Sequence, residues 1–166
     1  MPVETIISDK SLTESGFYWR ERDGVVILGC RPLEDAGFIN GFSTRLGGVS
    51  PFPADSLNLA GFNEDTAENI YENRRRFFEA LGTDHRLAAV WQVHGDGVKV
   101  IAEERDVRDL DEKFDALCSD LPQVVCGIKT ADCVPVLFAD PRTGAFAAAH
   151  AGWRGTVLSI AVRTIE

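Results

Sequence analysis

The sequence predicts an α+β domain with mixed β-sheets and flanking helices, and three observations lead to this prediction. The chain has 166 residues, of which 45% are hydrophobic, enough for one substantial core. One amphipathic helix pattern lies in its first half. Short apolar runs separated by turn residues fill its second half, which is typical of a mixed or antiparallel sheet. We therefore expect a single domain over residues 1–166.

The overall charge argues against several classes of partner. The chain has 17 Lys and Arg against 26 Asp and Glu, a net charge of −9, which repels phosphate backbones and anionic membranes. The segment from Met1 to Trp19 lacks a basic stretch followed by an apolar one, and no apolar window is long enough to span a bilayer. We expect a cytoplasmic protein that binds neither nucleic acid nor membranes.

The number and spacing of the cysteines predict that they are free thiols. The chain has four, none of them in a Cys-x-x-Cys pair, so the spacing excludes a structural zinc ribbon and a thioredoxin-like redox motif. A chain with a core of this size also folds without disulfide bonds.

The first half contains a hairpin, a glycine-rich loop and a helix. The apolar run 25–29 follows Asp23-Gly24 and reads as the return strand of a hairpin. The stretch 41–48 is polar and glycine-rich; it is either a ligand-binding loop or an ordinary surface loop. Apolar residues at helical spacing predict a helix over 65–81, with Asp65 and Glu68 as a capping box, Gly82 at its end and a solvated arginine run at 74–76.

The second half contains the predicted strands. A charged segment over 103–113 reads as a loop or short helix, and the residues after Gly155 as a helix that starts at Thr156. The strands are expected over 87–93, 97–102, 124–128, 133–139 and 145–150, with a turn at His94-Gly95-Asp96 between the first two.

The last two of these strands are expected to form a hairpin that creates a metal site. Residues 140–143, Asp-Pro-Arg-Thr, suit a type I turn, which would pair Ala139 with Gly144 and set Cys133 opposite His150. Opposed β-carbons lie about 4.5–5.5 Å apart. One metal ion can bridge that separation through a thiolate at roughly 2.3 Å and an imidazole at roughly 2.1 Å. Pro135 within the strand indicates an edge strand or a bulge, and a bulge would shift this register.

The residues after His150 have the composition of an active site. Small residues in His150-Ala-Gly-Trp-Arg-Gly155 leave space around an imidazole, an indole and a guanidinium, and a helix start beside Arg154 offers an anion site. Alone, Cys133 is typical of a small core residue, and His150 of a hydrogen-bonded surface group. Together they favour a site.

Five segments carry a resemblance to a known family. They are Gly41-Phe-Ser-Thr-Arg45, Leu57-Asn-Leu59, Trp91-Gln-Val-His-Gly95, Thr130-Ala-Asp-Cys133 and His150-Ala-Gly-Trp-Arg-Gly155. With them the chain resembles, over roughly residues 36–160, the laccase-domain family. That family was first described as multicopper polyphenol oxidoreductases and is also known as purine nucleoside phosphorylases or peptidoglycan editing factors.

The resemblance implies a zinc enzyme that acts on purine nucleosides and phosphate. Its implied reactions are phosphorolysis of adenosine, inosine and methylthioadenosine, with adenosine deamination as a further activity. A three-ligand metal leaves an open coordination position for such chemistry. The implied zinc ligands are His94, Cys133 and His150, the implied catalytic residues are Arg45, Gln92 and Asp132, and the implied substrate-binding residues are Ser43, Arg45 and Arg154.

The chain departs from the family pattern at its C-terminal end. Members usually continue beyond the His-Ala-Gly-Trp-Arg-Gly segment into a Gly-Pro-Cys-Ile-Gly-like motif, whereas this chain stops at Glu166 within a predicted helix. We expect a C-terminally truncated laccase-like domain whose last helix leaves an apolar stripe over residues 160–165 in need of a partner.

Three alternatives remain open. The first is a cysteine hydrolase with Cys133 as nucleophile, His150 or His94 as base and Asp132 or another acid as orienting group. The second is a copper-dependent polyphenol oxidase, although three histidines, of which His85 lies in a polar turn, allow only one mononuclear site. Copper also competes for such a site as a metal. The third is a zinc-stabilised interaction module, although structural zinc usually has four protein ligands.

Overall fold

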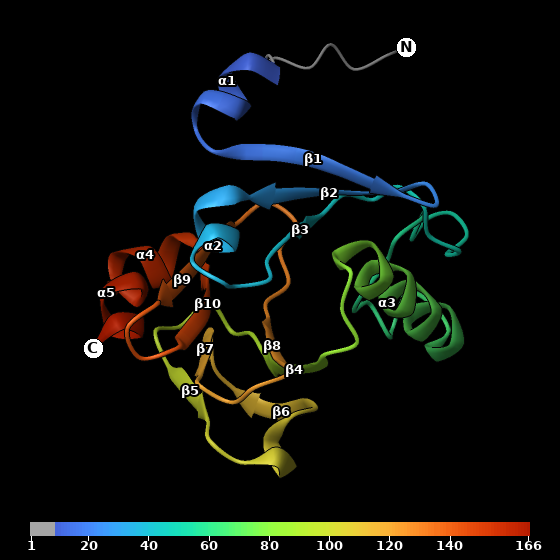
Figure 1. Ribbon diagram of the computed structural model, residues 1–166. Helices are drawn as coiled ribbons and strands as arrows, with labels where there is room; N and C mark the ends of the chain where they lie inside the picture. Colours follow the sequence, from blue (N-terminus) through green and yellow to red (C-terminus); the bar gives the residue numbers. More distant parts are fainter. Residues whose placement is uncertain (1–8) are drawn as a thin grey trace. The chain divides into compact units, whose positions relative to one another are not determined.

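A computed structural model describes residues 9–166, which form parts of two compact units, Met1–Asp84 and His85–Glu166 (Figure 1). Each unit is described by itself below, and the single domain expected over residues 1–166 stays a prediction. The first eight residues of the Met1–Trp19 segment lie outside the described residues. No helix within residues 9–166 has the length and apolar character that a bilayer span requires.

The first unit contains the predicted hairpin. After α1 (Asp9–Glu14), β1 (Phe17–Arg22) and β2 (Val25–Cys30) pair antiparallel, and β3 (Phe42–Ser43) joins β2 on its other side. The turn residues Asp23 and Gly24 have φ angles of 50° and 80°. Positive φ at both central residues is the geometry of a type I′ turn, which matches the twist of paired strands. A short helix, α2 (Arg31–Asp35), follows β2.

Helix α3 (Ala67–Leu81) packs against this sheet and closes the core of the first unit. Arg20 and Arg22 of β1 reach its last turn and donate hydrogen bonds to the carbonyl oxygens of Leu81, at 3.1 Å, and Glu79, at 2.8 Å. The Glu79 oxygen also accepts the N–H of Gly82 at 3.1 Å, and the two arginines add cationic donors to these terminal carbonyls, which stabilises the helix end. The helix ends at Gly82, as predicted, with φ at 75°. The buried core side chains are Val25, Ile27, Leu57, Ala80 and Leu81.

The start of α3 differs from the prediction. Thr66 is the N-cap residue and its hydroxyl accepts the backbone N–H of Asn69 at 3.3 Å, so the capping box of Asp65 and Glu68 was wrong. The Asp65 carboxylate instead accepts hydrogen bonds from the Thr66 backbone, at 2.8 Å, and the Asn69 side chain, at 2.7 Å. The hydroxyl is one residue nearer the first turn, which it therefore caps instead of the carboxylate.

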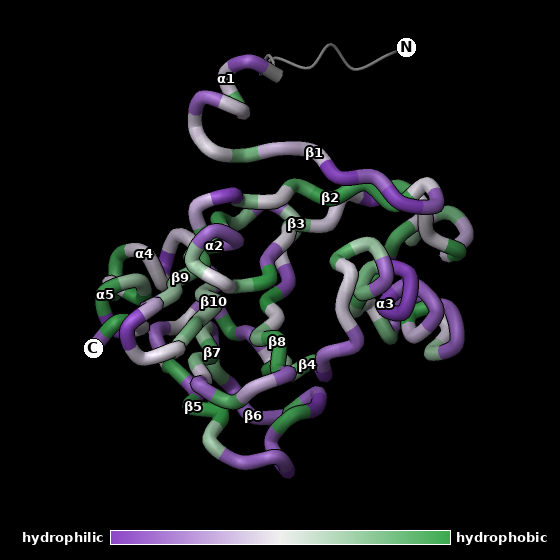
Figure 2. The backbone as a smooth tube through the Cα atoms, viewed as in Figure 1, coloured by the Kyte–Doolittle hydropathy of each residue, from purple (hydrophilic) through white to green (hydrophobic). Residues whose placement is uncertain are grey.

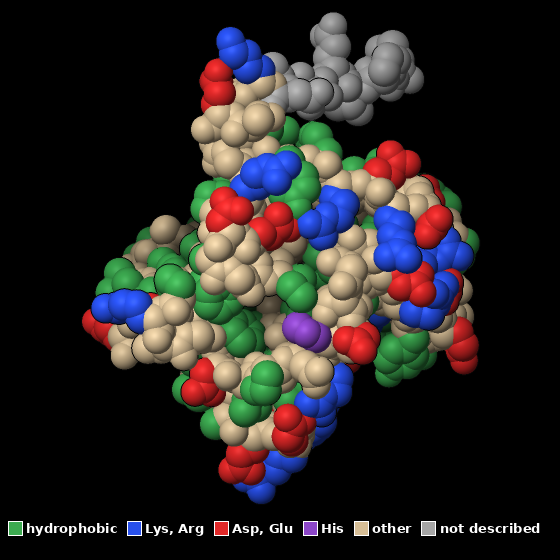
Figure 3. Space-filling view, viewed as in Figure 1, with side chains coloured by type: hydrophobic (Ala, Val, Ile, Leu, Met, Phe, Trp, Pro, Cys, Tyr) green, Lys and Arg blue, Asp and Glu red, His purple; other side chains and the backbone are tan. Residues whose placement is uncertain are grey.

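The exposed face of α3 is polar, but only Arg75 of residues 74–76 is exposed. Arg74 and Arg76 are partly buried and donate hydrogen bonds to the carbonyl oxygens of Leu59, at 2.8 Å, and Gly47, at 3.2 Å. Figure 2 shows the hydrophilic middle of α3 between more apolar ends, and Figure 3 shows acidic and basic side chains interleaved over it. Arg75 and Arg76 each lie 2.8 Å from a carboxylate oxygen of Glu72. Hydrogen bonds from Arg75 and Arg76 lower the pKa of Glu72 to about 2. The face is a solvated network of ion pairs.

The glycine-rich loop packs against its own continuation. A β-carbon at Gly48 would lie 1.9 Å from the carbonyl oxygen of Ser56, so glycine is required there by this close approach. Asn73 of α3 is fully buried; its side chain accepts the Val49 N–H at 2.8 Å and donates to the Ser50 hydroxyl, at 2.8 Å, and the Asn58 carbonyl, at 2.9 Å. One buried amide of α3 therefore holds several groups of the loop and its continuation.

Replacing Asn73 by Ala should destabilise the protein by about 2–4 kcal/mol, because several buried loop groups lose their hydrogen-bond partner at once. Denaturant unfolding of the whole chain measures the change. Arg75→Ala is the matched control: it lies on the same helix with an exposed side chain, and its ion pairs are screened by solvent. Equal unfolding midpoints for the two variants would contradict the role given to Asn73.

The second unit has two sheets. Strands β4 (Arg86–Trp91), β6 (Asp109–Lys113) and β8 (Val124–Gly127) form one in the order β6-β4-β8, with all pairs parallel. Strands β5 (Val98–Ile101), β7 (Ala116–Ser119), β9 (Val134–Asp140) and β10 (Ala145–Ala151) form the other in the order β5-β7-β10-β9, which mixes parallel and antiparallel pairs. The α+β class with mixed sheets is confirmed.

In the second unit, two strands were not predicted from the sequence and the start of one helix was misplaced. The charged segment contains a 3-10 turn (Glu104–Asp106) and then β6, whose charged residues suit the edge position that it has within residues 9–166. Strand β7 is only four residues long, too short for a periodic signal. Helix α4 (Trp153–Val157) begins before Thr156, and Ser159, with φ at 63°, separates it from α5 (Ile160–Ile165).

The predicted register of the β9–β10 hairpin was wrong by two positions. Asp140 pairs with Ala145, because Gly144, with φ at 80°, donates its N–H to the Asp140 carbonyl at 2.9 Å, so that residues 141–144 form the loop in place of 140–143. His150 therefore lies opposite Pro135, and Cys133 precedes the first residue of β9. A slip of two residues keeps every side chain on its original face, so Cys133 and His150 still share one side.

Pro135 is accommodated because its backbone faces outward. His150 donates its N–H to the Asp115 carbonyl at 2.7 Å, toward β7, so it makes no ladder hydrogen bond with its partner in β9. Pro135 therefore removes no donor from the pairing with β10. Within the described residues β9 is an edge strand, as its proline predicts.

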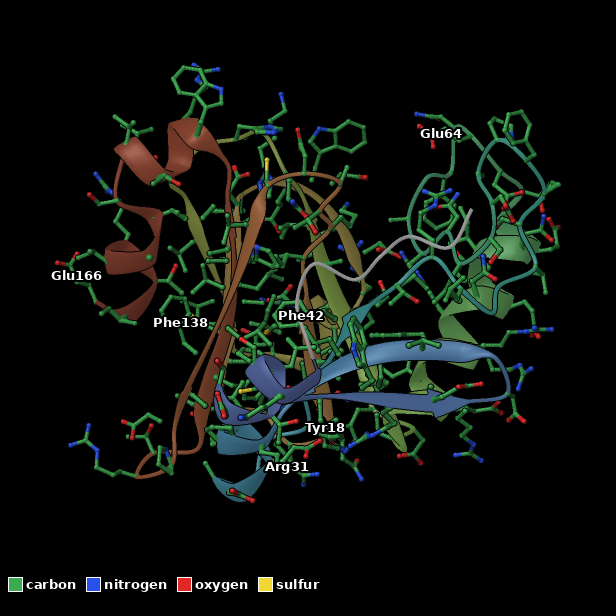
Figure 4. All side chains as sticks on the ribbon, turned by 90° about the horizontal axis from the view of Figure 1, so that it is seen from above. Tyr18, Arg31, Phe42, Glu64, Phe138 and Glu166 are labelled. Carbon is green, nitrogen blue, oxygen red and sulfur yellow. The ribbon has the colours of Figure 1, made fainter. Side chains whose placement is uncertain are left out.

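Helix α5 covers the four-stranded sheet. Ile160 is fully buried and packs with Ala116 and Ala149, while Phe138 of β9 packs against the same cluster and lies between β9 and α5 in Figure 4. The apolar stripe predicted over residues 160–165 is partly buried and partly exposed. Ile160 faces the core, whereas Val162 and Ile165 are exposed.

Candidate metal centre

Three side chains from separate elements of the second unit meet at one point. His94 follows β4, Cys133 precedes β9 and His150 lies within β10, and their ligand atoms all lie within 4.8 Å of one another. The Cys133 sulfur lies 3.8 Å from Nε2 of His94. The two imidazole rings meet edge to face, with centroids 4.7 Å apart. Within residues 9–166 this is the one such group of His, Cys, Asp or Glu that could hold a metal ion.

The donor set and its spacing fit a tetrahedral metal. A metal with sulfur at roughly 2.3 Å and nitrogen at roughly 2.05 Å holds these two donors about 3.6 Å apart. The observed separation of 3.8 Å between Cys133 and His94 is close to this value. His150 is buried, Cys133 is partly buried and His94 is exposed, so the group opens to solvent on one side. Three protein ligands with an open side correspond to a catalytic rather than a structural arrangement.

A buried carboxylate lies behind both histidines. Asp115 is fully buried, between β6 and β7, and its side chain accepts Nδ1–H of His150 at 2.8 Å. It also accepts the backbone N–H groups of Val93 at 3.2 Å, His94 at 2.9 Å and Gly95 at 2.7 Å. Burial alone would raise the pKa of Asp115, but the hydrogen bonds from His150 and these backbone groups lower it.

Sequence reasoning missed Asp115. The available signal was an acidic residue directly before the apolar run of β7, since a carboxylate entering a core needs strong hydrogen-bond partners. The short run concealed it, because β7 itself was not predicted.

Glycine at position 152 leaves the space that the ligands occupy. A β-carbon there would lie 2.8 Å from Cδ2 of His94, 3.4 Å from the Cys133 sulfur and 3.5 Å from Cε1 of His150. A β-carbon at Gly155 would lie 2.7 Å from the carbonyl oxygen of Gly95. The small residues of this segment therefore make room for the imidazoles, as the sequence indicated.

Gln92 and Asp132 lie beside the ligands in different environments. The Gln92 amide donates to the Lys129 carbonyl and accepts the Lys129 N–H, each at 2.7 Å, so it joins the segments that follow β4 and β8. Asp132 is exposed, and its carboxylate accepts the Cys133 thiol at 3.6 Å. Gln92 is thus committed to the loop that leads to Cys133, whereas Asp132 is open to a ligand.

The arginine candidates occupy different units. Arg154 is exposed at the start of α4, with its guanidinium 6.0 Å from the centroid of the Trp153 ring. Ser43 and Arg45 belong to the first unit, where both are exposed and Arg45 donates from Nε to the Asp55 carbonyl at 2.7 Å. The substrate and catalytic roles of these three residues stay predictions.

The cysteines are free thiols, as expected. Burial and the neighbouring Asp132 carboxylate raise the pKa of Cys133. Burial also raises the pKa of Cys126, in the core, to about 12. Without a metal, Cys133 therefore holds less thiolate at neutral pH than an ordinary cysteine.

Gly152→Ala should weaken zinc binding at least about tenfold, because the added methyl group displaces His94 from its place beside the other ligands. Chelator competition on the purified chain measures the dissociation constant. Val157→Ala, an exposed change on the adjoining helix α4, is the control and should retain the affinity of the unchanged protein. Unaltered affinity in Gly152→Ala would contradict the tight packing described above.

Several known proteins are similar to this chain. A family model described as multi-copper polyphenol oxidoreductase laccase matches residues 39–166. Purine nucleoside phosphorylase YfiH of Escherichia coli (strain K12) is 41% identical over 124 residues, which are 75% of this chain and 50% of that protein. A purine nucleoside phosphorylase of Deinococcus radiodurans is 44% identical over 126 residues, 75% of this chain and 47% of its own length.

Solved structures show the same relationship. YlmD from Geobacillus stearothermophilus aligns with a TM-score of 0.75 at 32% identity, covering 89% of this chain and 56% of that one. The Neisseria meningitidis protein NMB0706 aligns with a TM-score of 0.63 at 31% identity, covering 90% and 56%. This chain spans about half the length of the curated relatives that it matches. By the match over residues 39–166, it belongs to the multi-copper polyphenol oxidoreductase laccase family.

Proposed function

We propose that this chain carries the zinc centre of a purine nucleoside phosphorylase acting on adenosine, inosine and methylthioadenosine, with adenosine deamination as a further activity. The observation that carries the proposal is the convergence of His94, Cys133 and His150, whose ligand atoms lie within 4.8 Å of one another. Relatives named purine nucleoside phosphorylase at 41% and 44% identity support the reaction class.

Zinc suits this site better than the other candidate metals. One thiolate and two imidazoles are a common zinc donor set, whereas magnesium and calcium prefer oxygen ligands. Copper also favours nitrogen and sulfur donors and would compete for the site. When bound, zinc would supply a Lewis acid that polarises a substrate oxygen or a water at the open position.

The residues of the chain have separate proposed tasks in phosphorolysis. The acidic chain needs local cations to hold phosphate, and Arg45 and Arg154 are the proposed ones. Arg45 would hold a phosphate oxygen while phosphate attacks the anomeric carbon and the bond to the purine breaks. Asp132, exposed next to Cys133, would accept a hydrogen bond from the substrate. Gln92 is proposed to act by holding the loop that leads to Cys133.

A cysteine hydrolase is the second candidate, and one observation favours it. Asp115 holds His150, whose ring lies within the same cluster as the Cys133 sulfur, an order of acid, imidazole and thiol that is familiar from nucleophilic enzymes. The raised pKa of Cys133 disfavours it, because a catalytic thiol needs a lowered pKa. We therefore prefer the metal enzyme.

The first test combines metal content with activity. The chain purified without added metal should contain about one zinc, given its three-ligand site, and should release adenine from adenosine only when phosphate is present. Cys133→Ser should lose both properties. Cys118→Ser, the same chemical change on β7, should retain them. Zinc without adenine release would contradict phosphorylase activity of this chain while leaving the metal centre intact.

Alkylation separates the two candidates. In metal-free protein Cys133 should react with iodoacetamide more slowly at neutral pH than glutathione does, and its rate should rise toward alkaline pH, because its raised pKa leaves little thiolate. Peptide mapping by mass spectrometry follows Cys133 alone, and zinc should protect it. Rapid alkylation of Cys133 at neutral pH would favour the hydrolase.

A further inference from the structure

We propose that Asp115 is a positioning residue that holds both histidine ligands and selects the tautomer in which Nε2 of His150 faces the metal. The inference rests on the zinc centre of the proposed function and names the residue that organises it. Asp115 supplies no ligand atom to the group and acts through its hydrogen bonds.

The tautomer follows from the partner of Nδ1. A carboxylate has no proton to donate, so the 2.8 Å contact between Asp115 and Nδ1 of His150 requires the proton on Nδ1. In the neutral ring, Nε2 then has the free lone pair that a metal needs. Both side chains are buried, so water cannot readily replace this bond.

The same carboxylate holds the turn that presents His94. Three consecutive N–H groups, from Val93 to Gly95, converge on it. His94 has a φ of 59°, a left-handed backbone conformation that residues other than glycine seldom adopt. Because the carboxylate accepts hydrogen bonds from all three N–H groups, it stabilises the backbone turn that places the His94 imidazole beside Cys133.

An amide cannot replace this carboxylate. One oxygen of Asp115 accepts from His94 and His150, and the other accepts from Val93 and Gly95. In Asp115→Asn the NH2 group must replace one of these oxygens and face donors. If it faces Val93 and Gly95, the turn is disrupted. If it faces His150, it favours a proton on Nε2, which removes the lone pair from the metal.

The experiment compares the full chain with Asp115→Asn and with Ser119→Ala. Ser119 is the matched control. It is buried at the end of β7, whereas Asp115 is buried just before that strand, and the Ser119 hydroxyl binds backbone groups of Ile101 and Leu121 rather than the metal ligands. Chelator competition gives the zinc and cobalt dissociation constants, and the visible spectrum of the cobalt form reports the ligand geometry. Nitrogen NMR identifies the tautomer of His150 with and without zinc.

We expect Asp115→Asn to bind zinc about 10- to 100-fold more weakly, with an altered cobalt spectrum. The unchanged protein should carry the His150 proton on Nδ1, and Asp115→Asn should lose that tautomer. Ser119→Ala should match the unchanged protein in zinc affinity and in the tautomer of His150. Equal zinc affinity and an unchanged tautomer in Asp115→Asn would overturn the inference.

Two further outcomes remain decisive. If the unchanged protein binds no metal, the proposed zinc centre fails, and the tautomer of metal-free His150 still decides the role of Asp115. If Asp115→Asn does not fold, the NMR measurement on the unchanged protein decides it. A proton on Nε2 of His150 in that protein would then overturn the inference.

Discussion

The candidate centre depends on one buried carboxylate and the hydrogen bonds that converge on it. Asp115 joins the turn after β4 to β10, and no unpaired oxygen of this carboxylate faces the core. Removing a charge from water is unfavourable unless several donors compensate for it. Here those donors belong to the segments that carry His94 and His150, so satisfying the carboxylate also brings the two imidazoles together. The hydrogen bonds that offset the free-energy cost of burying Asp115 are therefore the same ones that fix the positions of His94 and His150.

The rest of the second unit provides the spacing for this arrangement. Its two sheets place three chain segments at one point, and Gly152 leaves the space between them unfilled by side-chain atoms. The Gln92 amide joins the segment after β4 to the one that leads to Cys133, at 2.7 Å in both directions. The three candidate ligands thus come from segments far apart in sequence, and hydrogen bonds from Asp115 and Gln92 hold these segments together.

The group of His94, Cys133 and His150 and most elements could be predicted from sequence, while the β9–β10 register and the hydrogen bonds of Asp115 could not. The turn residues Asp23 and Gly24 and the periodicity of α3 are local signals, and both elements appeared as expected. The β9–β10 register depended on whether Gly144 adopts a left-handed conformation, which no nearby residue dictates. Even so, the error of two positions preserved the shared side of Cys133 and His150. Asp115 lies before a strand too short to recognise, and its partners are distant in sequence, so its role was invisible to local patterns.

Pro135 has a consequence for how the molecule behaves in solution. Its backbone faces the outer edge of β9, opposite the side that pairs with β10, so the strand lacks one N–H donor where another polypeptide could add. The preceding residue, Val134, is apolar and exposed on the same strand, and a continuous row of donors beside such a residue would favour β-sheet aggregation. Within residues 9–166, the proline therefore makes the addition of another strand at this edge less favourable, and it does not interrupt the pairing with the strand that carries His150.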